Sequence, residues 1–513
     1  MAKMAKSLFR STSIVIANTG ISRVLGFART VVFAHFFGAM AGMDAFLIAF
    51  RIPNLMRKIF AEGAFSQAFV PVLSEYRQTQ EMTVIKRFLN DMAGTLGVSL
   101  LLITALFMIA SPWLVSVFAP GFAHTGDRFL YASDMLRITT PYMLFISLAA
   151  LCGAILNTYD DFGAPSFSPV LLNVALIGMA FLSPYFHIPI YALAWGTFVG
   201  GIVQLLFLLP FLQRRHLLPI PHISFKDPGV RKVLTLVVPA IVGVSVSQIS
   251  IIIDNIFASF LKVGSVSWLF YSDRITGLPL GVFAVAIATV ILPKLARQHT
   301  DKDTIAYSKT LDWSLRILIL IGIPASLGVL ALAGPVVATL FQYGQFTQYD
   351  VLMAKRSVMA FAVGIQAFML IKILASGFYA KQNIKTPVKI AIIAILTNIA
   401  CNAILIFPLA HAGLALSTSI AGFVNAGLLL FVLLRQKIYL PQPGWMLYGM
   451  RLVIATIAMM SFLWWGSGDL SVWFQHHWFW RGLHLAILLS GAMIIYFGCL
   501  LATGLRVSHF KET

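Results

Sequence analysis

Charged residues are scarce in this sequence, and acidic residues are the scarcest of them. Only 11% of the 513 residues are charged, and 18 Asp and Glu stand against 37 Lys and Arg. Soluble globular domains carry roughly 25% charged residues, so this composition excludes an ordinary water-soluble domain. A strongly positive net charge, here +19, can indicate nucleic-acid binding. In a membrane protein, however, Lys and Arg gather in cytoplasmic loops, and this explains the charge better. We therefore expect no nucleic-acid partner.

Cysteine and catalytic motifs are also largely missing. Cys152, Cys401 and Cys499 lie in or near apolar stretches, a pattern that indicates neither a disulfide framework nor a zinc site. Phosphate-binding loops, zinc-protease motifs and serine-hydrolase motifs do not occur. His476 and His477 lie in "SVWFQHHWFW", where tryptophan anchoring at a membrane interface is a better interpretation than a metal site. The sequence therefore predicts no enzyme.

Long apolar runs are what the chain has instead. Hydrophobic residues make up 59% of it, its mean hydropathy is +0.88, and runs long enough to cross a bilayer recur from end to end. The alternating pattern of a membrane β-barrel is absent. We predict an all-α polytopic membrane protein of about 14 transmembrane helices. The predicted spans are 10–37, 44–75, 86–117, 128–157, 165–184, 189–213, 231–261, 267–296, 307–340, 350–381, 386–408, 412–435, 445–466 and 480–504.

The loops between these spans predict the orientation. Loops such as "QRRHLLPIPHISFKDPGVRK" and "YAKQNIKTPVK" are basic and fall on one side with both termini, whereas "GAMAGM" and "PLAHAG" on the other side carry no Lys or Arg. Basic loops stay on the cytoplasmic side. We therefore expect a multi-pass inner-membrane protein with cytoplasmic N- and C-termini. The basic start "MAKMAKSLFR" is followed by no small-residue cleavage site, so we interpret it as part of a retained first helix.

Similar stretches recur at almost constant spacing. They are marked by Pro71 and Pro293, by Pro165 and Pro387, and by Leu193 and Leu414, which lie 222, 222 and 221 positions apart. Such spacing predicts two parallel six-helix repeats, as in some transporters, with a substrate site between them. We predict an N-terminal lobe (1–222), a C-terminal lobe (223–440) and two further helices (441–513).

Ionisable residues inside the predicted spans are costly and mark a function or pathway. Arg23 and Arg29 lie in the first span with Gly26 between them, about 120° apart around a helix. Arg51 and Arg57 repeat this spacing around Pro53 in the second span. Gly26 and Pro53 are candidate bends. For Arg51 and Arg57, snorkelling to the membrane surface remains an alternative.

Four further charged residues are candidates for the same kind of site. Asp44 opens the second span and is either a cavity residue or a helix N-cap. Asp273 and Arg274 either line a cavity or form a structural ion pair. Lys372 interrupts "GIQAFMLIKILASGF", and here we favour a cavity-facing role.

Cations outnumber anions among these residues, which predicts an anionic substrate. An arginine guanidinium can donate two parallel hydrogen bonds to a phosphate or diphosphate. The apolar surroundings suit a lipid tail. This combination indicates a phosphorylated lipid.

A second group of polar residues resembles a cation site. Asp254 interrupts an apolar run, Asn398 and Asn402 share one helix face, and Thr418 follows in the next span. Such oxygen ligands suit a hard cation such as Na⁺. Hydrogen bonds between helices are the alternative, and spacing alone favours them.

Several of these stretches together resemble a known family. "SRVLGFAR", "DAFLIAFRIPNLMRKIFAEGAFSQAFVPVLSEY", "GVSVSQIS", "GSVSWLFYSDR" and "GFYAKQNIKTPVKIA" look like the MurJ/MviN family of bacterial lipid II flippases in the multidrug/oligosaccharidyl-lipid/polysaccharide exporter superfamily. The resemblance implies alternating-access transport of an undecaprenyl-diphosphate-linked peptidoglycan precursor to the periplasmic leaflet for cell-wall synthesis. The alternatives are export of another polyprenyl-linked oligosaccharide or a drug on the same fold, or a membrane enzyme acting on the lipid.

The resemblance also implies roles for particular residues. Family arginines that line the central cavity match Arg23, Arg29, Arg57 and Arg274. Asp44 and Lys372 match further family positions, and Arg51 is a candidate for the same cavity. The last two helices are expected to form a groove for the lipid tail. Many relatives carry a glutamate where this chain has Gly277.

Two expectations concern ions and partners. In some relatives, residues that match Asp254, Asn398, Asn402 and Thr418 bind Na⁺, which makes Na⁺ a candidate coupling ion and the only cofactor expected. Lipid II and membrane lipids are the expected partners, and the chain is expected to act as a monomer.

Overall fold

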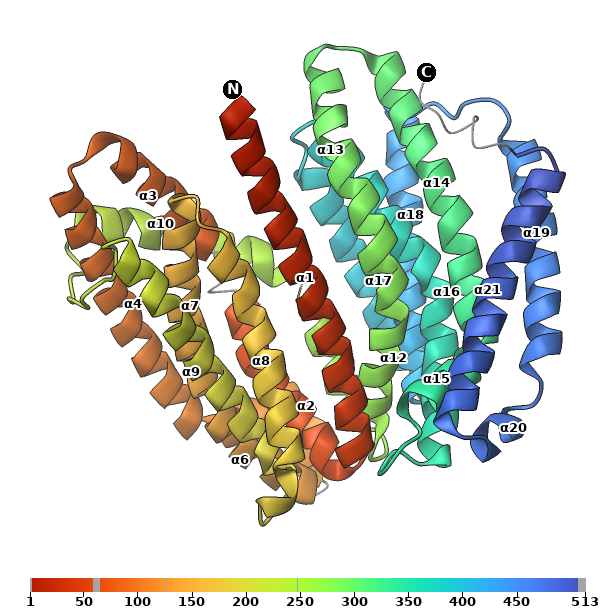
Figure 1. The fold of residues 1–513 in the computed structure, drawn as a ribbon, viewed down its shortest axis with the longest axis horizontal. Helices are drawn as coiled ribbons and strands as arrows, with labels where there is room; N and C mark the ends of the chain where they lie inside the picture. Colours follow the sequence, from red (N-terminus) through yellow and green to blue (C-terminus); the bar gives the residue numbers. More distant parts are fainter. Residues whose placement is uncertain (1, 59–64, 125, 247, 506–513) are drawn as a thin grey trace. The chain divides into compact units, whose positions relative to one another are not determined.

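The computed structural model describes residues 2–58, 65–124, 126–246 and 248–505, and regular structure in these ranges is helical throughout (Figure 1). The described chain divides into two compact units, Met1–Ser267 and Trp268–Thr513. The prediction of an all-α protein is confirmed. The predicted lobe boundaries follow the sequence repeat and stay predictions, because the compact units are defined by packing in space.

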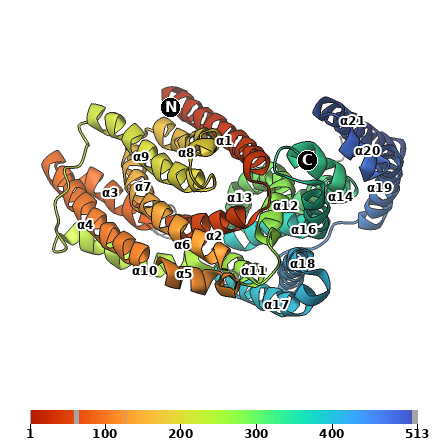
Figure 2. The same ribbon diagram turned by 90° about the horizontal axis from the view of Figure 1, so that it is seen from below.

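In the described residues of the first unit, eleven α-helices pack into a bundle (Figures 1 and 2). They are α1 (Ala2–Phe37), α2 (Ala41–Met56), α3 (Ser66–Thr79), α4 (Met82–Ile109), α5 (Ser111–Phe118), α6 (Asp127–Thr139), α7 (Pro141–Thr158), α8 (Gly163–Phe181), α9 (Tyr191–Arg214), α10 (Pro228–Val246) and α11 (Ile249–Ser259).

The second unit takes over within α12 (Ser265–Pro279), which continues through a wider π-helical turn, η4 (Leu280–Ala284), into α13. The other helices are α13 (Val285–Thr300), α14 (Thr304–Ala331), α15 (Ala333–Phe341), α16 (Gln348–Tyr379), α17 (Lys385–Leu409), α18 (His411–Arg435), α19 (Trp445–Ser467), α20 (Leu470–Gln475) and α21 (Trp478–Ala502).

Within the described residues, eleven helices are long and apolar enough to cross a membrane. The predicted spans 10–37, 44–75 and 231–261 are not among them. The first of these three spans corresponds to most of the long helix α1, which carries Arg23 and Arg29. The second contains α2 and α3 together with residues 59–64, which lie outside the described ranges, and the third contains α10 and α11. A number of 14 therefore stays a prediction, whereas the polytopic character is confirmed.

The local backbone repeats at the offset found in the sequence. Asp160 and Gln382 follow the C-terminal ends of α7 and α16 with φ of 63° and 57°, and they are 222 positions apart. His216 and Lys437 follow α9 and α18 with φ of 56° and 54°, and they are 221 positions apart. A left-handed residue is a common way to end an α-helix. The same helix stops therefore occur in both halves.

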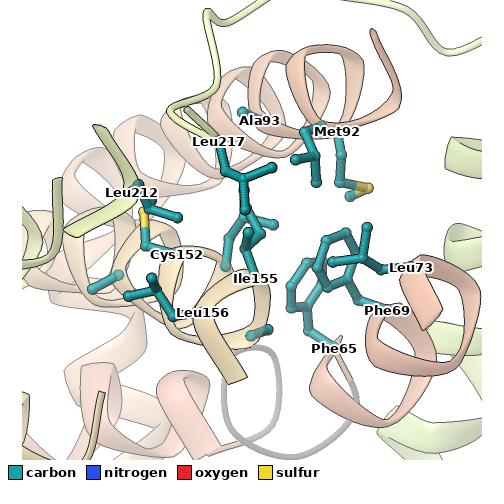
Figure 3. Packing of buried hydrophobic residues seen from close by; sticks show 14 of the residues in the cluster. Phe65, Phe69, Leu73, Met92, Ala93, Cys152, Ile155, Leu156, Leu212 and Leu217 are labelled. Carbon is teal, nitrogen blue, oxygen red and sulfur yellow. The ribbon is translucent and has the colours of Figure 1, made fainter. Parts of the chain in front are cut away.

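Each half also has its own apolar core. In the first unit, Phe65, Phe69 and Leu73 of the α3 region pack toward side chains from α4, α7 and α9 (Figure 3). In the second unit, the corresponding cluster joins α13, α14, α16 and α18. The two cores are thus built from helices at equivalent positions in the repeat.

The segment between α18 and α19 is fixed to α14 by a buried carboxylate. Asp312 Oδ1 accepts hydrogen bonds from Tyr439 Oη at 2.7 Å, Gln442 N at 3.0 Å and Trp445 Nε1 at 2.8 Å. Its Oδ2 lies 2.7 Å from Nε of Arg316, which also donates to the Gln442 carbonyl. This network attaches the α19–α21 pair, whose two helices lie side by side in both views (Figures 1 and 2), to the second unit.

The linker between α9 and α10 is fastened to α4 in a similar way. His222 N donates to the Asn90 carbonyl at 3.0 Å, and His222 Nδ1 lies 2.5 Å from the Asp91 carboxylate. Gly94 permits this close approach, because a Cβ at that position would lie 2.3 Å from the His222 carbonyl oxygen. The linker is therefore held against the first unit by specific contacts.

Gly94→Ala should destabilise the protein, because backbone atoms of the linker would have to shift. Overpacking of this kind costs about 1–3 kcal/mol. Gly97→Ala is the matched control on the same helix, since a Cβ at Gly97 meets nothing within 4 Å. The control should raise the free energy of unfolding by up to about 1 kcal/mol, through helix propensity. Thermal unfolding in detergent measures both, and shifts of the same sign would contradict the close contact.

Candidate functional site

The two arginines of α1 lie in different environments. Arg23 is exposed, whereas Arg29 is only 7% exposed and its guanidinium lies 5.5 Å and 5.9 Å from the ring centres of Phe33 and Phe50. Aromatic faces stabilise a desolvated cation. The helix is continuous through Gly26, and a bend at this residue stays a prediction. The spacing of six residues points the two side chains in different directions.

Arg57 follows directly after α2, which continues past Pro53 to Met56. Its side chain is half-buried, and its Nε donates to Asn54 Oδ1 at 3.1 Å. Arg51 is also half-buried. Because Asn54 holds the guanidinium on one side, the orientation of Arg57 is set by the same helix that carries it.

Arg57 lines a cavity of about 380 Å³ inside the first unit. Helices α1, α3, α7, α8 and α9 supply other walls, and most of the lining is apolar. Its polar lining residues include Ser22, Arg57, Ser168, Asn173 and Gln204. Arg57 is the charged side chain among the described lining residues. The cavity therefore combines one cation with neutral hydrogen-bonding groups, an arrangement that suits an anionic, polar ligand.

Asp44 is placed differently from the arginines. Its carboxylate is fully buried and accepts hydrogen bonds from Gly264 N at 2.7 Å, Ser267 N at 2.9 Å and Ser267 Oγ at 2.6 Å. Arg128 lies 3.8 Å away and donates to the Leu261 carbonyl. Asp44 thus acts as an N-cap, but for α12 and not for its own helix. Its carboxylate holds the α11–α12 loop against α2 and α6.

In the second unit, the two expected cationic residues are accessible. Arg274 of α12 is exposed and its guanidinium lies 5.1 Å from the Phe270 ring, and Lys372 of α16 is exposed as well. Asp273 is also exposed. A Cβ at Gly277 would meet nothing within 4 Å, so a larger side chain fits at this position.

Three of the four candidate sodium ligands form a chain of hydrogen bonds. Asn402 Nδ2 donates to Asn398 Oδ1 at 3.3 Å, and Asn398 Nδ2 donates to Thr418 Oγ1, also at 3.3 Å. The chain connects α17 to α18 in the second unit, and Asp254 lies half-buried on α11 in the first unit. No cluster of three or more His, Cys, Asp or Glu suited to a metal occurs in the described part of the chain, and three of the four candidate sodium ligands are amides or a hydroxyl.

Sequence reasoning missed two residues that the structure makes prominent. Arg128, beside Asp44, is only 3% exposed, although "GDRFLY" looks like an ordinary polar loop. Gln204, in the cavity wall, is only 2% exposed. The signal that could have identified Gln204 is a single amide within the apolar stretch "GGIVQLLFLL", because polar side chains in membrane helices usually have partners.

Comparisons with known proteins agree on one family. The sequence model of the family described as "Lipid II flippase MurJ" matches residues 33–488. The chain is 43% identical over 505 residues to a "Probable lipid II flippase MurJ" of Haemophilus influenzae, with 96% of this chain and 99% of that protein covered. It is 40% identical over 520 residues to the "Lipid II flippase MurJ" of Burkholderia cenocepacia, with 99% of both chains covered.

Solved structures show the same fold. A structure described as "Lipid II flippase MurJ, inward closed conformation" aligns with a TM-score of 0.79 at 26% identity, covering 94% of this chain and 97% of that one. A multidrug resistance MATE family transporter in an inward-facing conformation aligns with a TM-score of 0.67 at 15% identity, covering 83% and 97%. The second match shows a shared fold alone.

Asp44→Ala should destabilise the first unit strongly, since it removes the acceptor for three hydrogen bonds and the carboxylate beside Arg128. Breaking a buried pair typically costs about 3–5 kcal/mol. Ser267→Ala should cost only about 1 kcal/mol, because the two backbone donors remain. The exposed Asp301 provides the control, and Asp301→Ala should change stability by less than about 0.5 kcal/mol.

Thermal unfolding of the purified variants measures these effects. The double variant of Asp44 and Ser267 should cost less than the sum of the single ones, because both remove the same hydrogen bond. Equal effects of Asp44→Ala and Asp301→Ala would show that the buried network contributes nothing.

Proposed function

The chain belongs to the lipid II flippase MurJ family, and from this premise we propose how its own residues move lipid II across the membrane. The protein is a multi-pass bacterial membrane transporter and not an enzyme. The observation that carries the proposal is the set of arginines on α1, on α2 and directly after α2, of which Arg57 lines a cavity with no carboxylate among its described lining residues. Such a site favours the diphosphate of the substrate.

Arginine is suited to this task because its planar guanidinium donates two parallel hydrogen bonds to a phosphate. We propose that Arg23, Arg29 and Arg57 hold the diphosphate from the first unit, and that Arg274, Lys372 and Arg51 contribute to the same pathway. Phe33 and Phe50 pack near the Arg29 guanidinium and limit its orientation.

Transport then requires that the head group face one side of the membrane and afterwards the other. The two sequence repeats support an alternating-access cycle, in which the substrate site opens first to the cytoplasm and then to the periplasm. Asp44 is proposed to act in this cycle through the α11–α12 loop that it holds, and not by direct contact with substrate. This modifies the substrate-binding role expected from the sequence.

Orientation follows from charge. Basic loops, including the α9–α10 linker, share one predicted side with both termini, which supports cytoplasmic termini in the inner membrane. Lipid II is accordingly moved from the cytoplasmic to the periplasmic leaflet. One chain contains both repeats, and this supports a monomeric transporter. The α19–α21 pair, with exposed apolar residues such as Trp464 and Ile494, is proposed to hold the lipid tail.

A sodium ion is the proposed coupling ion, at Asp254, Asn398, Asn402 and Thr418. The hydrogen-bonded chain of Asn398, Asn402 and Thr418 supports a preorganised group of oxygen atoms. Oxygen ligands of this kind suit a hard cation. The carboxylate of Asp254 would supply the negative charge.

Arg29→Ala and Arg274→Ala should fail to replace the wild-type protein in cells depleted of their own flippase. Loss of a charge-assisted hydrogen bond costs about 1.5–3 kcal/mol, or roughly 10- to 150-fold in affinity. Arg29→Lys should restore growth only partly, because the lysine ammonium lacks the planar pair of N–H donors that a guanidinium presents to a phosphate. Arg297 is exposed near the end of α13, and Arg297→Ala should support normal growth. Normal growth with Arg29→Ala or Arg274→Ala would overturn the anion-binding proposal.

Asp254→Asn should remove the Na⁺ dependence of lipid II translocation in liposomes with controlled ion gradients. The amide keeps the size of the side chain but removes its charge. Asp301→Asn serves as the control for loss of an acidic residue. If translocation by Asp254→Asn responds to Na⁺ as the wild type does, the ion binds elsewhere or is not used.

A further inference from the structure

The cavity in the first unit contains a buried amide with one half of its hydrogen-bonding capacity unused. Gln204 of α9 is 2% exposed, and its Nε2 donates to the Ser168 carbonyl at 3.0 Å. Its Oε1 is buried and has no hydrogen-bond partner among the described residues. A buried acceptor without a donor costs about 1–3 kcal/mol. The structure therefore holds an acceptor that a donor from a ligand would satisfy.

The orientation of this amide is fixed by its neighbour. An exchange of the oxygen and nitrogen positions of Gln204 would place Oε1 against the Ser168 carbonyl oxygen, and neither atom could donate. Ser168 Oγ, at 3.4 Å from Nε2, is a second acceptor for the same nitrogen. The atom left without a partner is thus the carbonyl oxygen, which accepts from a hydroxyl or an amide N–H.

Other neutral groups share the cavity. Asn173 of α8 is buried, and its Nδ2 donates to the Ser22 carbonyl of α1 at 3.2 Å. Leu172 and Leu208 supply apolar surface between the polar groups. Arg57 adds the positive charge. The lining thus offers a cation for a phosphate together with amides and apolar patches, which are the features of a site for a sugar phosphate.

The size of the cavity agrees with this chemistry. At about 380 Å³, it lies near the lower end of the roughly 300–1,000 Å³ of small-molecule sites. It can accommodate a small polar group but not an entire lipid-linked oligosaccharide. A ligand there would be the part of the head group next to the phosphate.

We propose that this cavity is a saccharide subsite: Arg57 binds a phosphate oxygen, and Gln204 Oε1 accepts a hydrogen bond from the sugar attached to that phosphate. The proposal rests on the lipid II function and adds a recognition element to it. The arginines attract any polyprenyl diphosphate, whereas Gln204 distinguishes the lipid that carries a sugar. A site that hydrogen-bonds a substrate group rejects an analogue without that group.

The test measures binding of two lipids to the purified full-length protein: lipid II and undecaprenyl diphosphate without sugar. Gln204→Met keeps much of the side-chain volume but removes the amide. It should weaken lipid II binding about 3- to 10-fold, the equivalent of one hydrogen bond, and leave binding of the sugar-free lipid unchanged. Arg57→Gln should weaken binding of both lipids.

Two further variants separate recognition from structural effects. Gln298 has the same pattern as Gln204, since its Nε2 donates to Thr310 Oγ1 at 3.0 Å and its Oε1 is buried without a partner among the described residues. Gln298 lies outside the cavity lining, so Gln298→Met should change neither affinity. Ala150 lies on the cavity wall and provides a second variant. Ala150→Leu fills space in the cavity without removing a polar group, and it should also weaken the binding of lipid II but not that of the sugar-free lipid.

The outcomes are distinguishable. Selective loss of lipid II affinity in Gln204→Met and Ala150→Leu supports the subsite. If both variants bind both lipids as the wild type does, the cavity holds only water, and the subsite is refuted while the effect of Arg57→Gln still supports the flippase proposal. Equal weakening of both lipids would reduce Gln204 to a structural role. If the wild type binds neither lipid, the proposed function fails together with the subsite.

Discussion

Placing a charge in an apolar medium is costly, and this cost determines how the charged residues of this protein are arranged. A helix that crosses a bilayer cannot leave a carboxylate or guanidinium without compensation, so charged residues within spans are rare and have specific roles. Two solutions occur in the described chain. Asp44 and Asp312 are surrounded by hydrogen-bond donors from segments far away in sequence. Arg29 is packed against aromatic rings. The first solution holds distant segments together, and the second stabilises a buried cation against aromatic faces.

This difference separates structural charges from functional ones. A carboxylate that accepts three or more hydrogen bonds has little capacity left for a ligand, and its energetic contribution is the attachment of a loop or a linker. Arg57 is oriented on one side by a neutral amide, Asn54. The surplus of cations that the composition shows includes the arginines of α1 and of the C-terminal end of α2, where we propose that the diphosphate binds.

Most of the fold could be predicted from the sequence, because apolar run length and loop charge report directly on the bilayer. The end of α10 and the start of α11 inside one predicted span were not predicted, since hydropathy does not detect a helix end inside an apolar segment. The arginines could be proposed as site residues because charge is conspicuous in such segments. The partners of Asp44 were not found, because Gly264, Ser267 and Arg128 come together only through tertiary packing. Gln204 shows the same limit, since its unused acceptor depends on the position of Ser168 in space.

The paired helix stops have a consequence for how such a chain arises. Asp160 and Gln382, and likewise His216 and Lys437, adopt matching left-handed conformations although the residues in each pair differ and none is glycine. If the halves descend from one duplicated ancestor, the side chains at these stops diverged while the backbone shape persisted. Selection has then acted on where each helix ends, because extending a membrane-spanning helix by one turn would place polar groups in the lipid.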